Sequence, residues 1–201
     1  AGFCTCCFLC LYQPFMKIWV GDKLMLEFPA VICLCVYFFI FEINQLLNTY
    51  KDAAGIWHED RFRPLVTAAV NLGMNLALVK VCGIYGVLLS TALSMLFVGM
   101  PWLLHNLFTV LFKKSQMRCY LFRLVRYVLV TVISCLLCGY LCSYLHFSEY
   151  LTLIVRGAVC CVIPNVVYWL AYHRMPEFRE SIQLADKITK NKFKLEEKIL
   201  R

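Results

Sequence analysis

The sequence predicts an all-α integral membrane protein of about six transmembrane helices. Of its 201 residues, 62% are hydrophobic and 16% are charged, whereas a soluble domain is about half apolar and about a quarter charged. The mean hydropathy is +0.72, and the apolar residues form long runs separated by short charged segments. A membrane barrel would instead show alternating polarity along each strand. The lipid bilayer is therefore the expected surrounding of this chain.

Six segments are candidates for membrane helices, because crossing about 30 Å of hydrocarbon at about 1.5 Å per residue takes roughly 20 residues. Segment 1–16 is short and begins without Met or a basic leader, so we expect the remainder of a longer helix there. The five later segments are longer apolar runs. The candidates, which together predict one helical bundle over residues 1–172, are 1–16, 29–49, 64–82, 84–112, 124–145 and 150–172.

The distribution of Lys and Arg predicts the orientation. If six helices alternate in direction, one set of loops and the tail carry 16 of the 20 positive residues. The opposite loops carry only Lys17, Lys23 and Lys80, and Arg156 lies inside a segment. Positive residues accumulate in cytoplasmic loops, so residues 173–201 are expected to form a basic cytoplasmic tail, either as a surface helix or as a solvated segment. Topology and anionic lipid explain the net charge of +8 before nucleic acid does.

Polar residues inside the apolar segments are the first candidates for function, because they are costly in hydrocarbon. Glu42 and Gln45 share one face of segment 29–49, while Asn44 and Asn48 lie on nearly the opposite face. We expect Glu42 and Gln45 to line a substrate or ion pathway.

Two other segments also carry polar residues. Asn71 and Asn75 form a stripe that suits either a cavity wall or helix packing. Arg156 is a candidate for a cavity, with snorkelling to the headgroups as the alternative. Asn165 follows Pro164 and suits either a pathway or an interhelical hydrogen bond.

The 13 cysteines do not predict a metal site. Two groups within the apolar runs have metal-like spacing, namely Cys4, Cys6, Cys7 and Cys10, and Cys135, Cys138 and Cys142. We interpret both as core packing, because cysteine is a common small hydrophobic residue. Residues 58–60 read His-Glu-Asp and are expected to form a solvated turn. With no phosphate-binding glycine loop, the sequence predicts neither a cofactor nor an ATPase.

One stretch resembles a known family. Residues 50–91 include, in order, Tyr50-Lys-Asp-Ala-Ala-Gly55, Arg61, Arg63-Pro64, Asn71-Leu72, Asn75, Lys80, Gly83-Ile-Tyr-Gly-Val87 and Ser90-Thr91. This pattern resembles the bacterial polysaccharide flippases of the MOP exporter superfamily, which translocate O-antigen and other lipid-linked oligosaccharides. The upstream Pro14 with Trp19, Val20 and Gly21 is similar to the loop before this region in those proteins.

The resemblance implies a carboxyl-terminal fragment of a fourteen-helix, two-bundle transporter in the bacterial inner membrane. It implies export of an oligosaccharide carried on undecaprenyl pyrophosphate by alternating access. Polysaccharide polymerase and assembly proteins are then the expected partners. Arg61 and Arg63 would capture the pyrophosphate, unless they only set topology, and Glu42 would exchange a coupling proton or cation.

Three alternatives remain open on the sequence alone. The first is a multidrug or cation antiporter of the same superfamily. The second is a membrane-embedded glycan-modifying enzyme, which would need His58 with Asp60, or His105, at an aqueous face. The third is a non-catalytic scaffold of a polysaccharide assembly complex.

Overall fold

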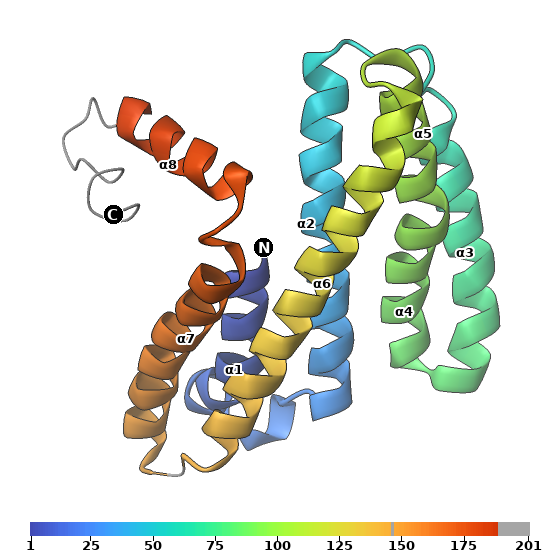
Figure 1. Cartoon of the computed structure of the whole chain (residues 1–201). Helices are drawn as coiled ribbons and strands as arrows, with labels where there is room; N and C mark the ends of the chain where they lie inside the picture. The colour runs from blue at the N-terminus through green and yellow to red at the C-terminus, as the bar shows by residue number, and fades with distance from the viewer. Residues whose placement is uncertain (146, 189–201) are drawn as a thin grey trace.

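The computed structural model describes residues 1–145 and 147–188, and all regular structure within these ranges is helical (Figure 1). The elements in chain order are α1 (Gly2–Trp19), η1 (Asp22–Leu24), α2 (Phe28–Ala53), α3 (Arg63–Cys82), α4 (Ile84–Ser94), η2 (Met95–Gly99), α5 (Met100–Val110), α6 (Lys114–Ser143), α7 (Glu149–Tyr172) and α8 (Pro176–Ile188). Within the tail, residues 176–188 thus form a helix, and 189–201 lie outside the described residues.

Five helical segments are long and apolar enough to cross a membrane: Phe28–Ala53, Arg63–Cys82, Ile84–Val110, Lys114–Ser143 and Glu149–Tyr172. This confirms the predicted all-α membrane fold. The segment corresponding to residues 1–16 forms an 18-residue helix that is not one of these five. The segment predicted as 84–112 is one continuous helical segment, Ile84–Val110. Within it, the π-helix η2 separates the α-helices α4 and α5.

The helices form two groups. α7 packs against α1 and α6, and α1 and α6 also contact each other. The second group contains α2, α3, α4, η2 and α5, with α3 packed closely on α4. α1 contacts α2, and α5 contacts α6. Figure 1 shows α7 and α3 on opposite sides of the molecule, so α1, α2 and α6 form the connection between the groups.

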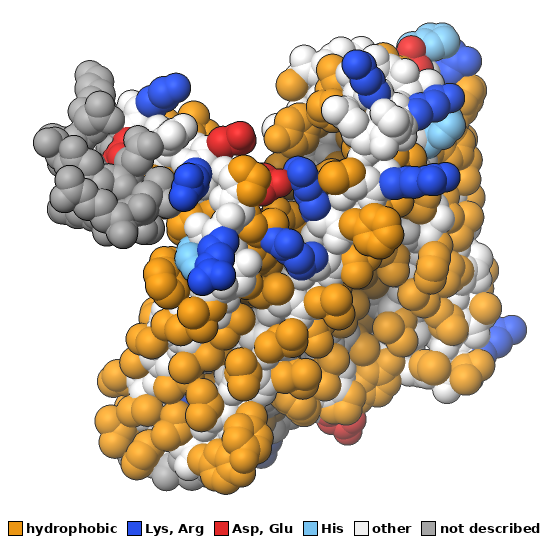
Figure 2. Space-filling view, in the orientation of Figure 1, with side chains coloured by type: hydrophobic (Ala, Val, Ile, Leu, Met, Phe, Trp, Pro, Cys, Tyr) orange, Lys and Arg blue, Asp and Glu red, His pale blue; other side chains and the backbone are white. Residues whose placement is uncertain are grey.

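The outer surfaces of these helices are apolar. Large exposed side chains include Leu72, Val81, Leu136 and Ile154, each more than 60% exposed. Figure 2 shows hydrophobic side chains covering most of the visible face of the two groups. Exposed apolar surface on this scale marks contact with lipid or a partner, in agreement with the lengths of the helices.

A tight hairpin places α3 against α4. Gly83 joins the two helices with φ of +57°, a conformation that favours glycine. Three residues later, a Cβ added to Gly86 would lie 2.5 Å from the backbone carbonyl carbon of Leu78. The backbones of α3 and α4 can therefore lie in direct contact because residue 86 has no side chain. Small residues commonly allow such close contacts between membrane helices.

The two ends of the helix bundle differ in charge. The end formed by the α2–α3 loop, the α5–α6 loop and the α7–α8 junction, here called the basic end, carries most of the Lys and Arg visible in Figure 2. At the opposite end Lys17 Nζ lies 3.1 Å from Glu149 Oε1, which joins α1 to α7. The hydrogen bond with Glu149, followed by the charge of Asp22, raises the pKa of the exposed Lys17 ammonium.

Candidate functional site

A buried ion-pair network at the basic end is centred on Asp60. Its carboxylate oxygens accept hydrogen bonds from Arg63 Nε at 2.7 Å and from Arg63 Nη2 at 2.8 Å. Lys51 Nζ lies 3.5 Å from the same carboxylate, and Asn106 Nδ2 donates to Asp60 Oδ1 at 3.3 Å. Asp60 is 3% exposed, so the network joins α2, the α2–α3 loop, α3 and α5 away from water.

The solvated turn expected at residues 58–60 is therefore wrong for Asp60. His58 and Glu59 are exposed, as expected for a turn. The chain nevertheless turns inward at Asp60, because two buried cations and an amide surround its carboxylate. A buried carboxylate with such partners is far less costly than an isolated one.

A column of polar side chains continues from this network toward the middle of the second helix group. Arg63 Nη2 donates to Asn48 Oδ1 at 2.8 Å, and Asn48 Nδ2 donates to Asn44 Oδ1 at 3.2 Å. Asn44 Nδ2 and Thr67 Oγ1 both lie 3.6 Å from the position of a Cβ on Gly99, the last residue of the π-helix. The face of α2 opposite Glu42 thus packs against protein.

A cavity of about 610 Å³ lies between the two helix groups near the basic end. Residues of α1, α2, α6 and α7 line it, and its polar groups come mainly from α6 and α7. These polar residues are Tyr120, Arg123, Tyr127, Thr131, Tyr168 and Tyr172. The remaining lining is largely apolar, including Phe39, Ile43 and Leu46 of α2. A largely apolar cavity with a few polar groups is typical of small-molecule sites.

The tyrosines of the cavity contact one another. Tyr127 and Tyr172 meet edge to face with ring centroids 5.3 Å apart, and Tyr168 stacks on Tyr172 at 6.1 Å. The Tyr168 hydroxyl is buried close to Thr131, without a hydrogen bond of normal geometry to any described residue. The cavity therefore offers aromatic faces, while the Tyr168 hydroxyl is itself enclosed by protein.

Helix α8 is held beside this cavity by a lining residue. Arg123 Nη1 lies 2.8 Å from Glu177 Oε1 in the first turn of α8. Arg126, three residues further along α6, contacts the sulfur of Met175. These contacts connect the α7–α8 junction to α6 at the basic end.

Of the two pathway residues predicted on α2, Glu42 lies on the helix face next to the cavity-lining residues Phe39 and Leu46, whereas Gln45 is directed away from them. Glu42 is half-buried, and helical geometry places it about 40° from Leu46 and about 60° from Phe39 around the helix axis. Its carboxylate has no hydrogen bond or ion pair within residues 1–145 and 147–188. Gln45 is exposed and accepts a hydrogen bond from Asn48 Nδ2 at 3.3 Å.

The other predicted pathway residues lie away from the cavity. Asn71 and Asn75 are half-buried on α3, and Asn71 Oδ1 is buried without a partner among the described residues. Arg156 Nη2 donates to the Leu145 carbonyl at 3.3 Å. Asn165 is exposed and donates to the Cys161 carbonyl of its own helix at 2.6 Å. The structure therefore does not bring the six predicted pathway residues together.

The two arginines predicted to capture pyrophosphate have different surroundings. Arg61 is exposed and contacts His58 Nε2 at 3.2 Å. Arg63 is buried, with Nε and Nη2 both engaged by Asp60. Capture by Arg63 would therefore require its guanidinium to leave the Asp60 carboxylate, whereas Arg61 is accessible as it stands.

The cysteines gather at the contact between α1, α6 and α7. Five are buried in one cluster: Cys6, Cys10, Cys138, Cys142 and Cys160. Sequence spacing identified neither the convergence of the three helices nor the inclusion of Cys160. The tyrosine cavity was likewise missed, although Tyr168 and Tyr172 are one turn apart and Tyr120 and Tyr127 are two turns apart on their helices.

The fold and this geometry define an all-helical, multi-pass membrane protein with a tyrosine-lined cavity between two helix groups. Comparisons with protein-family models, with curated proteins and with solved structures give no significant match.

Proposed function

We propose that this chain is part of a transporter that moves a lipid-linked oligosaccharide across the bacterial inner membrane, with the basic end in the cytoplasm. The observation that carries the proposal is the cavity of about 610 Å³ between the helix groups, with four tyrosines and one arginine in its lining. The resemblance of residues 50–91 to polysaccharide flippases supplies the substrate class.

The chemistry of the lining suits a sugar attached to a phosphate. Sugar rings present C–H faces that pack on aromatic rings, and hydroxyl edges that hydrogen-bond to phenol groups such as that of the exposed Tyr127. Arg123 supplies a planar cation of the kind that binds phosphate oxygens in pairs, provided that its guanidinium exchanges Glu177 for the phosphate. The cavity volume lies within the range of about 300 to 1,000 Å³ that is common for small-ligand sites, which suits one or two sugar units.

The arrangement of the helices supports alternating access. The cavity lies where the two helix groups face each other, with lining from α1, α6 and α7 on one side and from α2 on the other. Rocking of one group against the other would open such a cavity first to one side and then to the other. Within the second group, the Asp60 network and the polar column keep α2, α3 and α5 together during this movement.

Glu42 is the proposed coupling group. Its carboxylate is half-buried at the edge of the cavity and lacks a partner within the described part of the chain. Such a group is able to exchange a proton or a cation as the cavity changes its exposure.

An antiporter of lipophilic cations is the second candidate. Tyrosine faces attract cations, and Glu42 beside them would compensate the charge of the substrate. The two candidates differ in the role of Arg123, because a cation in the transporter would repel Arg123 whereas a pyrophosphate would be held by it.

The test is translocation of a fluorescent lipid-linked oligosaccharide in liposomes that contain the full-length protein. Tyr172→Leu and Arg123→Gln are expected to lower the rate at least about tenfold, equivalent to about 1.4 kcal/mol. The matched controls are Tyr144→Leu at the opposite end of α6 and the exposed Arg118→Gln on the same helix as Arg123. These controls should stay within about twofold of the wild-type rate.

Two outcomes would contradict this proposal. Unchanged translocation in both cavity variants would remove the cavity as the substrate site. Proton-driven efflux of a lipophilic cation by the wild type, increased by Arg123→Gln and abolished by Glu42→Gln, would establish the antiporter instead.

A further inference from the structure

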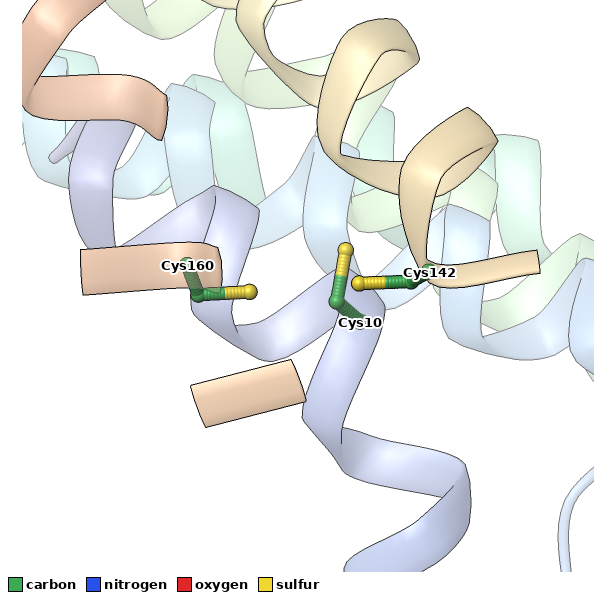
Figure 3. Close-up of side chains that lie close together, drawn as sticks. All are labelled: Cys10, Cys142 and Cys160. Carbon is green, nitrogen blue, oxygen red and sulfur yellow. The ribbon is translucent and has the colours of Figure 1, made fainter. Parts of the chain in front are cut away.

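Three buried cysteines from three helices converge inside the first helix group. They are Cys10 of α1, Cys142 of α6 and Cys160 of α7, and their Sγ atoms all lie within 4.8 Å of one another. Figure 3 shows the side chains of Cys142 and Cys160 directed toward each other, with the side chain of Cys10 between them. Each is at most 5% exposed, and all three are free thiols.

Cys160 lies well inside α7, whereas Cys142 lies in the last turn of α6. Cys160 follows the start of α7 at Glu149 by 11 residues, which corresponds to about 16 Å along the helix. That distance is about half of a hydrocarbon core of about 30 Å. Because all three side chains are at most 5% exposed, water is a poor candidate for an additional ligand at these sulfurs.

The spacing of the sulfurs suits a three-coordinate soft cation. Three thiolates at about 2.3 Å from a metal ion lie about 4.0 Å apart in a planar triangle. The observed separations of up to 4.8 Å exceed that value by at most about 0.8 Å. Small side-chain rotations close such a gap.

Helix α7 is adapted to this adjustment. Pro164 is almost fully buried one turn after Cys160. Proline has no backbone N–H, so the carbonyl of Cys160 lacks its usual helical donor and α7 is locally easier to deform. Cys160 is therefore the ligand best able to move toward the other two sulfurs.

Arg156 supplies a compensating charge. It precedes Cys160 by one turn of α7 and is close enough to Cys142 for electrostatic interaction. Its Nε atom is buried without a normal hydrogen bond to any described residue. A cationic donor with unused capacity beside a thiol cluster reduces the cost of thiolate charge in an apolar medium.

We propose that Cys10, Cys142 and Cys160 bind one Cu(I) ion. Thiolate ligands select soft cations such as Cu(I), whereas structural Zn²⁺ takes four ligands in a tetrahedron. Within the described part of the chain, the sulfurs of three residues lie within 4.8 Å of one another at this point. Each thiol that becomes a ligand releases its proton on binding, and Arg156 offsets one of the resulting negative charges. The site is independent of the tyrosine cavity and of the substrate proposed for it.

Copper titration of the reduced full-length protein in detergent tests this site. Cu(I) is supplied under argon with ascorbate, and bound metal is measured by competition with the coloured chelator bathocuproine disulfonate. The wild type should retain about one Cu(I) per chain. Cys10→Ala, Cys142→Ala and Cys160→Ala should each lower the affinity at least about a hundredfold, since each removes one ligand.

Matched controls separate ligand loss from general effects. Cys82→Ala on α3 and Cys119→Ala near the start of α6 replace exposed cysteines outside the cluster, and both variants should bind copper like the wild type. Arg156→Gln should keep the stoichiometry and lower the affinity about tenfold. Each variant is used only if its thermal unfolding without copper matches the wild type. X-ray absorption of the wild-type complex should show three sulfur neighbours at about 2.3 Å.

Several outcomes would overturn the assignment. One is retention of copper by the Cys10→Ala/Cys142→Ala/Cys160→Ala triple variant. Another is loss of copper on replacement of Cys6 and Cys135, whose sulfurs lie 3.3 Å apart, while the proposed ligands are dispensable. A third is binding of Zn²⁺ by the wild type with four sulfurs and with higher affinity than Cu(I). If no single variant matches the wild type in thermal unfolding, the X-ray absorption spectrum of the wild-type complex decides. Two sulfur neighbours of the copper ion in place of three would also refute the assignment.

Discussion

Arg63 donates to both carboxylate oxygens of Asp60 through Nε and Nη2, at 2.7 and 2.8 Å. This paired geometry fixes the orientation of both groups. Because Asp60 lies in the α2–α3 loop and Arg63 is the first residue of α3, the pair determines where α3 begins. The same carboxylate also receives Lys51 from α2 and Asn106 from α5.

Asp60→Asn should destabilise the second helix group by about 3 kcal/mol, because Arg63 would remain buried without a counter-charge. Lys51 would keep Asp52, whose Oδ1 lies 2.8 Å from its Nζ. Chemical unfolding of the protein in detergent measures this change. Glu59→Gln alters a neighbouring exposed carboxylate and should shift the unfolding free energy by less than about 0.5 kcal/mol. Equal stability of the two variants would show that the buried ion pair is not needed.

Gly86→Ala should separate α3 from α4 and cost roughly 2 kcal/mol, because the added Cβ would overlap the Leu78 backbone. A backbone cannot rotate away as a side chain can. Gly73→Ala on α3 is the matched control, since no atom lies within 4 Å of the added carbon. The control should be as stable as the wild type or slightly more stable, and a similar loss in both variants would contradict the close contact.

Arg123→Gln should release α8 from α6 without unfolding the helix groups. The Arg123–Glu177 pair is partly exposed, so its loss should change global stability by less than about 1 kcal/mol. Limited proteolysis should cut within Pro176–Ile188 faster than in the wild type. The swapped variant Arg123→Glu/Glu177→Arg should restore protection, and unchanged cleavage of Arg123→Gln would show that other contacts hold α8.

Two native cysteines test the proposed orientation. Cys82 ends α3 at the opposite end of the bundle, and Cys119 lies in the second turn of α6 near the basic end; both are exposed. A membrane-impermeant maleimide added outside intact cells should label Cys82 and spare Cys119. Cys82→Ser and Cys119→Ser identify the labelled residue, and labelling of Cys119 alone would reverse the orientation.

Sequence patterning predicted the helices of the membrane bundle well, because each depends on a local run of apolar residues. The segments expected at 64–82 and 150–172 correspond closely to Arg63–Cys82 and Glu149–Tyr172. The π-helix within 84–112 was not predicted. The sequence of η2 is as apolar as the residues around it. The spacing of apolar residues therefore does not reveal a single π-helical turn.

The candidate site was predicted less well, because it depends on which sides of the helices pack against one another. Glu42 was correctly separated from Asn44 and Asn48, since a helix of known pitch fixes their relative directions. Sequence alone did not show that Asn44 faces Gly99 and Thr67. It also did not show that Tyr127 of α6 meets Tyr172 of α7.

The sequence by itself determined that this chain is helical and lipid-embedded, because the hydropathy and the length of an apolar segment depend only on residues that are neighbours in the chain. Only the tertiary structure decided that Asp60 is buried, that four tyrosines share a cavity and that three cysteines meet. Each of these depends on contacts between helices far apart in the chain, which are set by packing and not by local composition.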